Sequence, residues 1–293
     1  MEEYILLSGK HLLTGITIDS IKSRIQEIET LNRENVTIED LKAKIGLLIK
    51  GYSCTTRIID SDFAYRARKN PKNKHFCHVR ELWYPPSDRI MIPSRLNRVG
   101  RSIFYISASE ATAILEMRPR IGEIMTILRC RLINSDVKPH VMELGCAEKF
   151  SQHKIPTTLN VLENTTYGRK FLSNQENIEK NLLIRSFLTR EFTRVVKRGN
   201  EFEFKVTVAI GEILMSDSRI DGVVYPSIAG DVDNWKADSN MALKPESADR
   251  LYMPDICWIV EVEKELGTFL NKSYLIHCIK KAQSITQDGK INW

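Results

Sequence analysis

The sequence lacks several patterns that define common classes of protein. No apolar run approaches the roughly 18 residues that a membrane-spanning helix needs, so we expect no membrane span. No G-x-G-x-x-G follows a predicted strand and no G-x-x-x-x-G-K-S/T occurs, which argues against Rossmann and P-loop nucleotide sites. The start Met1-Glu2-Glu3 has no basic stretch before an apolar one, so we expect no secretory signal and a cytoplasmic protein.

Cysteine spacing also excludes common kinds of site. The six cysteines include no C-x-x-C pair, and a chain of 293 residues with 42% hydrophobic residues can form its own core, so a disulfide framework is not expected. His75, Cys77 and His78 lie close together in sequence, but no second pair of closely spaced Cys or His completes a zinc site. We therefore expect no metal.

Charge is present but spread along the chain. Lysine and arginine total 43 against 37 acidic residues, a net charge of +6 that favours acidic ligands such as nucleic acid, a polyphosphate or an acidic partner protein. No run of five or six basic residues occurs, and no helix-turn-helix or RNA-recognition pattern is found. Dedicated nucleic-acid binding is therefore disfavoured.

Residues 1–51 predict a helical hairpin. Apolar residues recur at three- and four-residue steps, which is typical of one buried helix face, and Asp19 is a candidate N-cap. The recurring residues are Ile18, Ile21, Ile25, Ile28 and Leu31 in the first helix and Leu41, Ile45 and Leu48 in the second. The hairpin could be a lid packed on its own domain or a docking element, and it is compatible with a homodimer.

After residue 51 short strands and helices mix without a βαβ rhythm, which predicts an α+β fold. Ser109 is the expected cap of a helix that begins at Glu110. Residues 140–173 carry few periodic signals and predict a long irregular insertion. The remaining expected elements are strands at 102–107, 123–133, 219–225 and 241–243, helices at 110–117, 175–197 and 205–215, and a strand or short helix at 274–279.

Three segments that lie far apart in the sequence contain the candidate catalytic and binding residues. Arg66 follows Phe63-Ala64-Tyr65, Glu116 ends a small-residue helix after the strand that holds Tyr105, and Ser227 follows an apolar strand ending in Tyr225-Pro226. A cation, an anion and a small hydroxyl, each beside a tyrosine, suit the binding of a dinucleotide and cleavage of its glycosidic bond. A carboxylate can stabilise the positive charge that develops on a sugar ring as its glycosidic bond breaks.

These segments, in this order, resemble the RES-domain family of toxins, often found in toxin–antitoxin pairs. Ser94-Arg95-Leu96-Asn97-Arg98 and Asn240-Met241-Ala242-Leu243 add to the resemblance. It implies an ADP-ribosyltransferase-like mixed sheet core with flanking helices at residues 52–260. We expect residues 1–51 to form an N-terminal helical extension and residues 261–293 to form a tail packed on the domain.

The resemblance also implies NAD+ as substrate and a role for each site residue. Glu116, Arg66 and Ser227 map onto the catalytic residues, and Tyr105 onto the tyrosine that stacks on nicotinamide. Arg66 would clamp the pyrophosphate, and Arg95 would bind a cofactor phosphate or inorganic phosphate. The aromatic residue that follows the arginine in some members is Ala67 here, so Tyr65 is expected to take over its stacking.

The most concrete reading is a toxin-like enzyme that cleaves NAD+ at the nicotinamide–ribose bond with phosphate or water as acceptor. The enzymatic alternative is a mono-ADP-ribosyltransferase that modifies a protein target. The other alternative is a non-enzymatic module that binds nucleic acid or a partner. An antitoxin protein is an expected partner by resemblance, whereas the sequence does not encode the acceptor in any motif.

Overall fold

The computed structural model describes residues 15–49, 52, 56–72, 74–144, 174–227, 229, 239–268 and 271–293. These residues form two compact units, each assembled from several chain segments. The first contains the described residues up to Ile58, then Ile92–Arg98 and the described residues of His140–Ile220. The second contains Ile59–Met91, Val99–Pro139 and the described residues of Asp221–Trp293.

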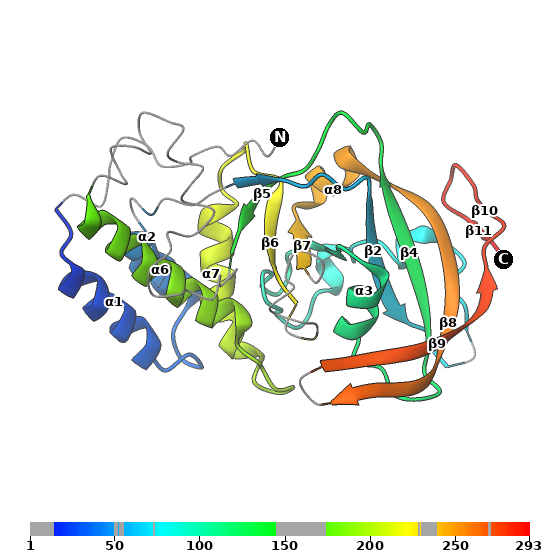
Figure 1. Cartoon of the computed structure of the whole chain (residues 1–293), viewed down its shortest axis with the longest axis horizontal. Helices are drawn as coiled ribbons and strands as arrows, with labels where there is room; N and C mark the ends of the chain where they lie inside the picture. The colour runs from blue at the N-terminus through cyan, green and yellow to red at the C-terminus, as the bar shows by residue number, and fades with distance from the viewer. Residues whose placement is uncertain are drawn as a thin grey trace. The chain divides into compact units, whose positions relative to one another are not determined.

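The first unit is a helical bundle with a small strand pair (Figure 1). Its helices are α1 (Ile18–Thr30), α2 (Ile38–Ile49), α6 (Gln175–Thr193) and α7 (Lys205–Leu214), and a 3-10 turn, η4 (Glu201–Phe204), leads into α7. Helix α1 packs on α2 and α6, and α7 packs on α2 and α6. Strands β1 (Thr56–Ile58) and β5 (His140–Glu143) pair antiparallel.

The apolar faces of α1 and α2 are used inside this unit. Ile21, Ile28 and Leu41 are fully buried, as the three- and four-residue spacing predicted. The cap of α1 is Thr17, whose side chain accepts the Ser20 N–H at 3.1 Å, so the expectation that Asp19 caps this helix is wrong. Asp19 lies in the first turn instead, where a carboxylate is favoured by the helix dipole.

The second unit is built on an antiparallel sheet in the order β6-β7-β3-β2-β4-β8-β9. Figure 1 shows β8 and β9 as a long curved hairpin beside β4. The bounds are β2 Phe63–Lys69, β3 Phe104–Ser107, β4 Ile124–Leu132, β6 Gly222–Pro226, β7 Ser239–Leu243, β8 Tyr252–Thr268 and β9 Asn271–Lys281. The unit also contains α3 Glu110–Glu116, α8 Pro245–Leu251, 3-10 turns η1 Val79–Glu81 and η2 Ser87–Arg89, and the pair β10 Ser284–Ile285 and β11 Ile291–Asn292.

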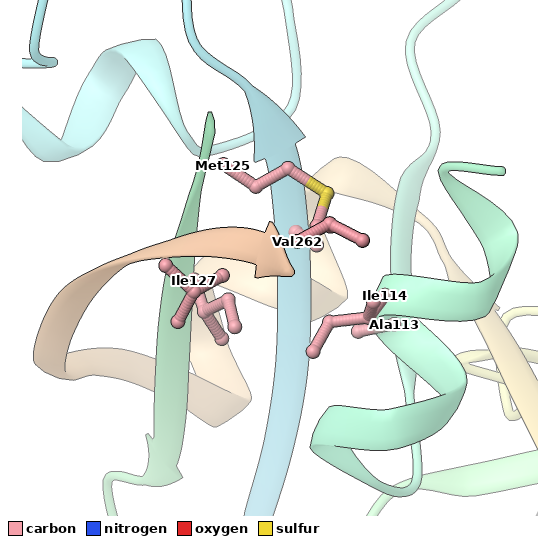
Figure 2. Packing of buried hydrophobic residues seen from close by; sticks show 7 residues of the cluster. Ala113, Ile114, Met125, Ile127 and Val262 are labelled. Atoms are coloured by element: carbon pink, nitrogen blue, oxygen red, sulfur yellow. The ribbon is translucent and has the colours of Figure 1, made fainter. Parts of the chain in front are cut away.

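Helix α3 is anchored on one face of this sheet by small and branched side chains. Ala113 and Ile114 pack against Met125 and Ile127 of β4 and Val262 of β8, all nearly inaccessible to solvent (Figure 2). The small side chain at Ala113 lets the helix approach the strands closely. Ser109 caps the helix as expected, accepting the Thr112 N–H at 3.1 Å, so the position of the last residue, Glu116, is fixed.

The join between β2 and β3 is short. Strand β2 pairs with β4 along its whole length, from Phe63 to Lys69, whereas it pairs with β3 through Tyr65 and Ser107. The two described strands therefore share one register pair at this position. Ser107 of this pair is linked through Asn240 to Glu116, the last residue of α3.

The α+β class, with a large sheet, flanking helices and N-terminal helices, is confirmed. Irregular structure was wrongly expected for His140–Glu143, which form β5, while residues 145–173 of that expected insertion lie outside the described residues. The predicted division of the chain at residues 51 and 260 stays a prediction, and β8 runs through the second of these positions.

A buried ion pair ties the first unit together. Arg33, between α1 and α2, donates from two nitrogens to Glu191 of α6, each at 2.8 Å, and both side chains are at most 5% exposed. Burial opposes the charge of Arg33, but the hydrogen bond and the charge of Glu191 raise the pKa of Arg33 overall. The pair therefore compensates two charges that would be costly alone.

We expect Glu191→Ala to lower the free energy of unfolding by about 3 kcal/mol, because it removes the two hydrogen bonds to the buried Arg33 guanidinium and leaves only Glu203, at 3.3 Å, to compensate that charge. Chemical denaturation followed by circular dichroism measures this loss. The control is the double variant Arg33→Met with Glu191→Leu, which removes both charges and should lose less than the single variant. A loss within about 0.5 kcal/mol for Glu191→Ala would contradict the expectation.

Candidate active site

The Glu116 carboxylate is held by two neutral donors from the sheet. Its Oε1 accepts the Ser227 hydroxyl at 2.6 Å and the Asn240 side-chain amide at 2.5 Å. Within the described residues Glu116 forms no ion pair. The carboxylate is thus fixed in position, and its charge remains available to a positively charged ligand.

The donors come from the ends of different strands. Ser227 follows β6, is fully buried, and also accepts the Ala229 N–H at 3.2 Å. Asn240 lies in β7, and its Oδ1 accepts the Ser107 hydroxyl of β3 at 2.7 Å. A continuous hydrogen-bonded chain therefore runs from Ser107 through Asn240 and Glu116 to Ser227, joining β3, β7, the end of α3 and the end of β6.

Strand register gathers tyrosines on the same sheet face. Tyr65 pairs with Ser107, Ser107 with Asn240, and Asn240 with Tyr225, so these four side chains project from one face. Tyr105, two residues before Ser107 on β3, shares that face. Tyr65 and Tyr105 therefore share the sheet face from which Asn240 reaches Glu116, and their role in binding stays a prediction.

Trp258 braces this arrangement from β8. Its indole ring meets Tyr65 edge-on, with ring centroids 6.4 Å apart. Its Nε1 donates to Glu110 of α3 at 2.8 Å. Tyr65 and both ends of α3 are therefore fixed by direct contacts, which is the rigidity that a binding site requires.

Arg66 points to the other face of β2. It follows Tyr65 directly, and side chains alternate along a strand. Its guanidinium donates to the Tyr105 carbonyl at 2.5 Å and lies 5.5 Å from the centroid of the Phe104 ring. Burial, with a smaller contribution from the charge of Arg68, lowers the pKa of Arg66 to about 10, so it remains a cation at neutral pH.

A model of the RES domain matches residues 64–257, which is more than half of the chain. The chain belongs to the RES domain family. This family is associated with toxin-like proteins that act on NAD+. No curated protein and no solved structure matches the chain.

Arg95 of this RES-domain protein is engaged within the first unit. Its guanidinium donates to the carbonyls of Glu191 at 3.4 Å and Arg194 at 3.2 Å, and lies 5.5 Å from the centroid of the Phe204 ring. These contacts anchor the segment Ile92–Arg98 on α6 and η4. The predicted role of Arg95 in binding phosphate stays a prediction.

The part of the RES-domain chain that the structure describes contains no group of three or more His, Cys, Asp or Glu side chains that could hold a metal ion. Its helices include none long and apolar enough to cross a membrane. In the His75–His78 segment, the amides of Cys77 and His78 donate to the Glu81 carboxylate, at 3.0 and 3.1 Å. That segment is organised by a helix cap.

Asn240 and Ser107 were missed as site residues of the RES domain. Both lay inside segments that carry the resemblance, but neither had been assigned a role. The available signal was Asn240 itself, since a side-chain amide that directly precedes the apolar run Met241-Ala242-Leu243 must find a partner when the strand is buried. Its partner is the catalytic candidate Glu116.

We expect Asn240→Ala to lower the free energy of unfolding by about 1–3 kcal/mol, because it leaves the buried Ser107 hydroxyl unpaired and removes one donor from Glu116. Chemical denaturation of Asn240→Ala, Ser107→Ala and the double variant measures their coupling. A hydrogen-bonded pair predicts a coupling energy of at least about 0.5 kcal/mol. Strictly additive losses would show that the two side chains act independently.

Proposed function

We propose that this RES-domain protein is an NAD+-degrading enzyme that cleaves the bond between nicotinamide and ribose. The observation that carries the proposal is the Glu116 carboxylate, held by Ser227 and Asn240 and without a cationic partner among the described residues. An anion fixed in this way suits a transition state in which positive charge develops on the substrate. Phosphate or water is the proposed acceptor.

The proposed reaction needs little help at the leaving group. As the bond between C1′ of ribose and nitrogen of nicotinamide breaks, its electron pair stays with nicotinamide, which departs neutral from a cationic ring. Carbon C1′ gains oxocarbenium character, and Glu116 stabilises that charge or binds a ribose hydroxyl. A phosphate oxygen then bonds to C1′ and gives a phosphorylated ADP-ribose, or water does so and releases a proton.

Other residues have supporting roles in this proposal. Ser227 and Asn240 orient the carboxylate, since both donate to the same oxygen. Tyr105 and Tyr65 offer rings on the same sheet face, where a cationic nicotinamide ring gains from aromatic stacking. Ser227 donates to Glu116 at 2.6 Å and accepts the Ala229 N–H at 3.2 Å, which fits an orienting role.

Arg66 acts through Tyr105 in this proposal. Its donated hydrogen bond holds the Tyr105 carbonyl at the short join between β2 and β3, so it positions the strand that carries the stacking ring. Direct clamping of the pyrophosphate, the role predicted by resemblance, is the competing account. The two accounts differ in how large a loss removal of the guanidinium causes.

We expect Glu116→Gln to release nicotinamide at least about 100-fold more slowly than the original chain, because a neutral amide cannot offset the developing charge. Liquid chromatography of nicotinamide formed from NAD+ measures the rate. The matched control is Glu110→Gln on the same helix, whose amide oxygen can still accept from Trp258. Unchanged turnover in a folded Glu116→Gln variant would rule out the assigned role.

The acceptor is tested in the same reactions. Mass spectrometry of products formed with and without phosphate distinguishes phosphorylated ADP-ribose from ADP-ribose. Label from NAD+ that appears on protein would instead support the mono-ADP-ribosyltransferase alternative. Salt-sensitive nucleic-acid binding without nicotinamide release would support a non-enzymatic module.

We expect Arg66→Gln to lower kcat/KM for nicotinamide release by about 10- to 100-fold, the loss expected when a charged hydrogen bond to the Tyr105 carbonyl is removed. The control is Arg68→Gln, two residues along the same strand face, whose guanidinium donates to the Glu81 carbonyl. That control should lose less activity. A loss beyond about 1,000-fold without loss of stability would favour direct clamping of the substrate phosphates.

In a cell, this activity would act as a toxin. We expect expression of the chain without an inhibitor to drain NAD+ and stop growth. An antitoxin protein that inhibits the enzyme is the partner that this proposal anticipates.

A further inference from the structure

A cavity of about 1210 Å³ opens in the second unit, apart from the Glu116 network. Its lining comes from β2 at Arg68, from the segment Phe76–Arg89, and from the chain around Asp249–Pro254. Arg68 shares the face of β2 with Arg66, opposite Tyr65 and Ala67. Glu116, Ser227 and Asn240 do not line this cavity.

Basic side chains at this cavity are free to bind an anion. Arg80 and Arg89 are exposed, and neither guanidinium makes an ion pair or a side-chain hydrogen bond within the described residues. Arg68 donates to the Glu81 carbonyl. Two arginines at one cavity provide the planar, multiple donors that phosphate groups require.

The acidic side chains at the cavity already have hydrogen-bond donors. Asp249 accepts the Trp83 Nε1 at 3.0 Å and the Tyr84 hydroxyl at 2.6 Å. The Glu81 carboxylate accepts two backbone amides. Both acids are therefore held by neutral groups, and neither forms an ion pair with the cavity arginines in the described structure.

Asp249 also fixes two aromatic rings at the cavity. Trp83 packs on the buried Phe104 ring, with centroids 4.3 Å apart and planes inclined by 32°. Trp83 and Tyr84 are only half-buried, so part of each ring remains accessible. Rigid aromatic surfaces of this kind favour the stacking of a planar ligand ring.

Tyr252 forms part of the buried wall of the cavity. The residue is 2% exposed, it lines the cavity, and its hydroxyl has no hydrogen-bond partner among the described residues. Burial raises the pKa of Tyr252 well above its usual range, so the hydroxyl keeps its proton at neutral pH. The hydroxyl oxygen is itself almost inaccessible to solvent, so Tyr252 contributes ring surface to the cavity wall and its hydroxyl does not face a ligand there.

We propose that this cavity is a second binding site, for a small phosphorylated molecule with a planar ring, the chemical class of the mononucleotides. Arg80 and Arg89 bind the phosphate, and Trp83 and Tyr84 contact the ring. The site is separate from the Glu116 network and does not depend on NAD+ cleavage there.

The test uses the full chain and AMP as the probe, with equilibrium dialysis of labelled AMP as the measurement. We expect the double variant Arg80→Gln with Arg89→Gln to bind AMP at least about 10-fold more weakly, because each arginine–phosphate contact is charge-assisted. The matched control, Arg101→Gln with Arg120→Gln, removes the same charge from exposed positions outside the cavity and should bind normally. Tyr252→Phe, which keeps the ring in the cavity wall, should bind AMP normally.

Two further measurements separate this site from the proposed catalytic one. AMP binding should survive in Glu116→Gln, and nicotinamide release should survive in the Arg80/Arg89 variant. The proposal is overturned if AMP fails to bind, if the Arg80/Arg89 variant binds it normally, or if Glu116→Gln abolishes binding. It is also overturned if inorganic phosphate alone, or an acidic peptide without a ring, competes as well as AMP.

Discussion

The hydrogen bonds from Ser227 and Asn240 to Glu116 are the interactions on which the candidate active site depends. A carboxylate at the last residue of a helix lies near the negative end of the helix dipole, an unfavourable place for an anion. Two neutral donors offset this without neutralising the charge. Asn240 is aligned by the register of β7, and a slip of one residue would turn its side chain to the opposite sheet face. The sheet therefore determines where the carboxylate is held.

Most helices could be predicted from the sequence because their signals are local. The spacing of apolar residues in α1 and α2, and Ser109 before α3, depend only on near neighbours along the chain. The hairpin of β8 and β9 was missed for a physical reason. Strand β8 has register shifts between Ile259 and Val260 and between Val262 and Lys264, so no single alternation runs through it. Residues 252–268 form one long strand because they pair with β4 and β9, and this tertiary pairing cannot be read from the local sequence.

Part of the candidate active site could also be predicted from the sequence. Glu116 and Ser227 were found from the order of segments, and they do meet. The contribution of Asn240 depends on which strands are neighbours, and this is decided by tertiary pairing. The separation of Tyr65 from Arg66 could have been anticipated, because consecutive residues on a strand face opposite ways. What the sequence could not supply was the contact between Arg66 and the Tyr105 carbonyl.

The short join between β2 and β3 gives the sheet an uneven mechanical strength. Strand β2 pairs with β4 along its length, but it pairs with β3 only at Tyr65 and Ser107 among the described residues. The Arg66 side chain adds one hydrogen bond to the Tyr105 carbonyl of β3. Few backbone hydrogen bonds would be lost if the strands parted there, and regions with few such bonds open at the least cost. Tyr65 lies on one side of this seam and Tyr105 on the other, so small opening motions would change the gap between their rings while each half of the sheet stayed intact.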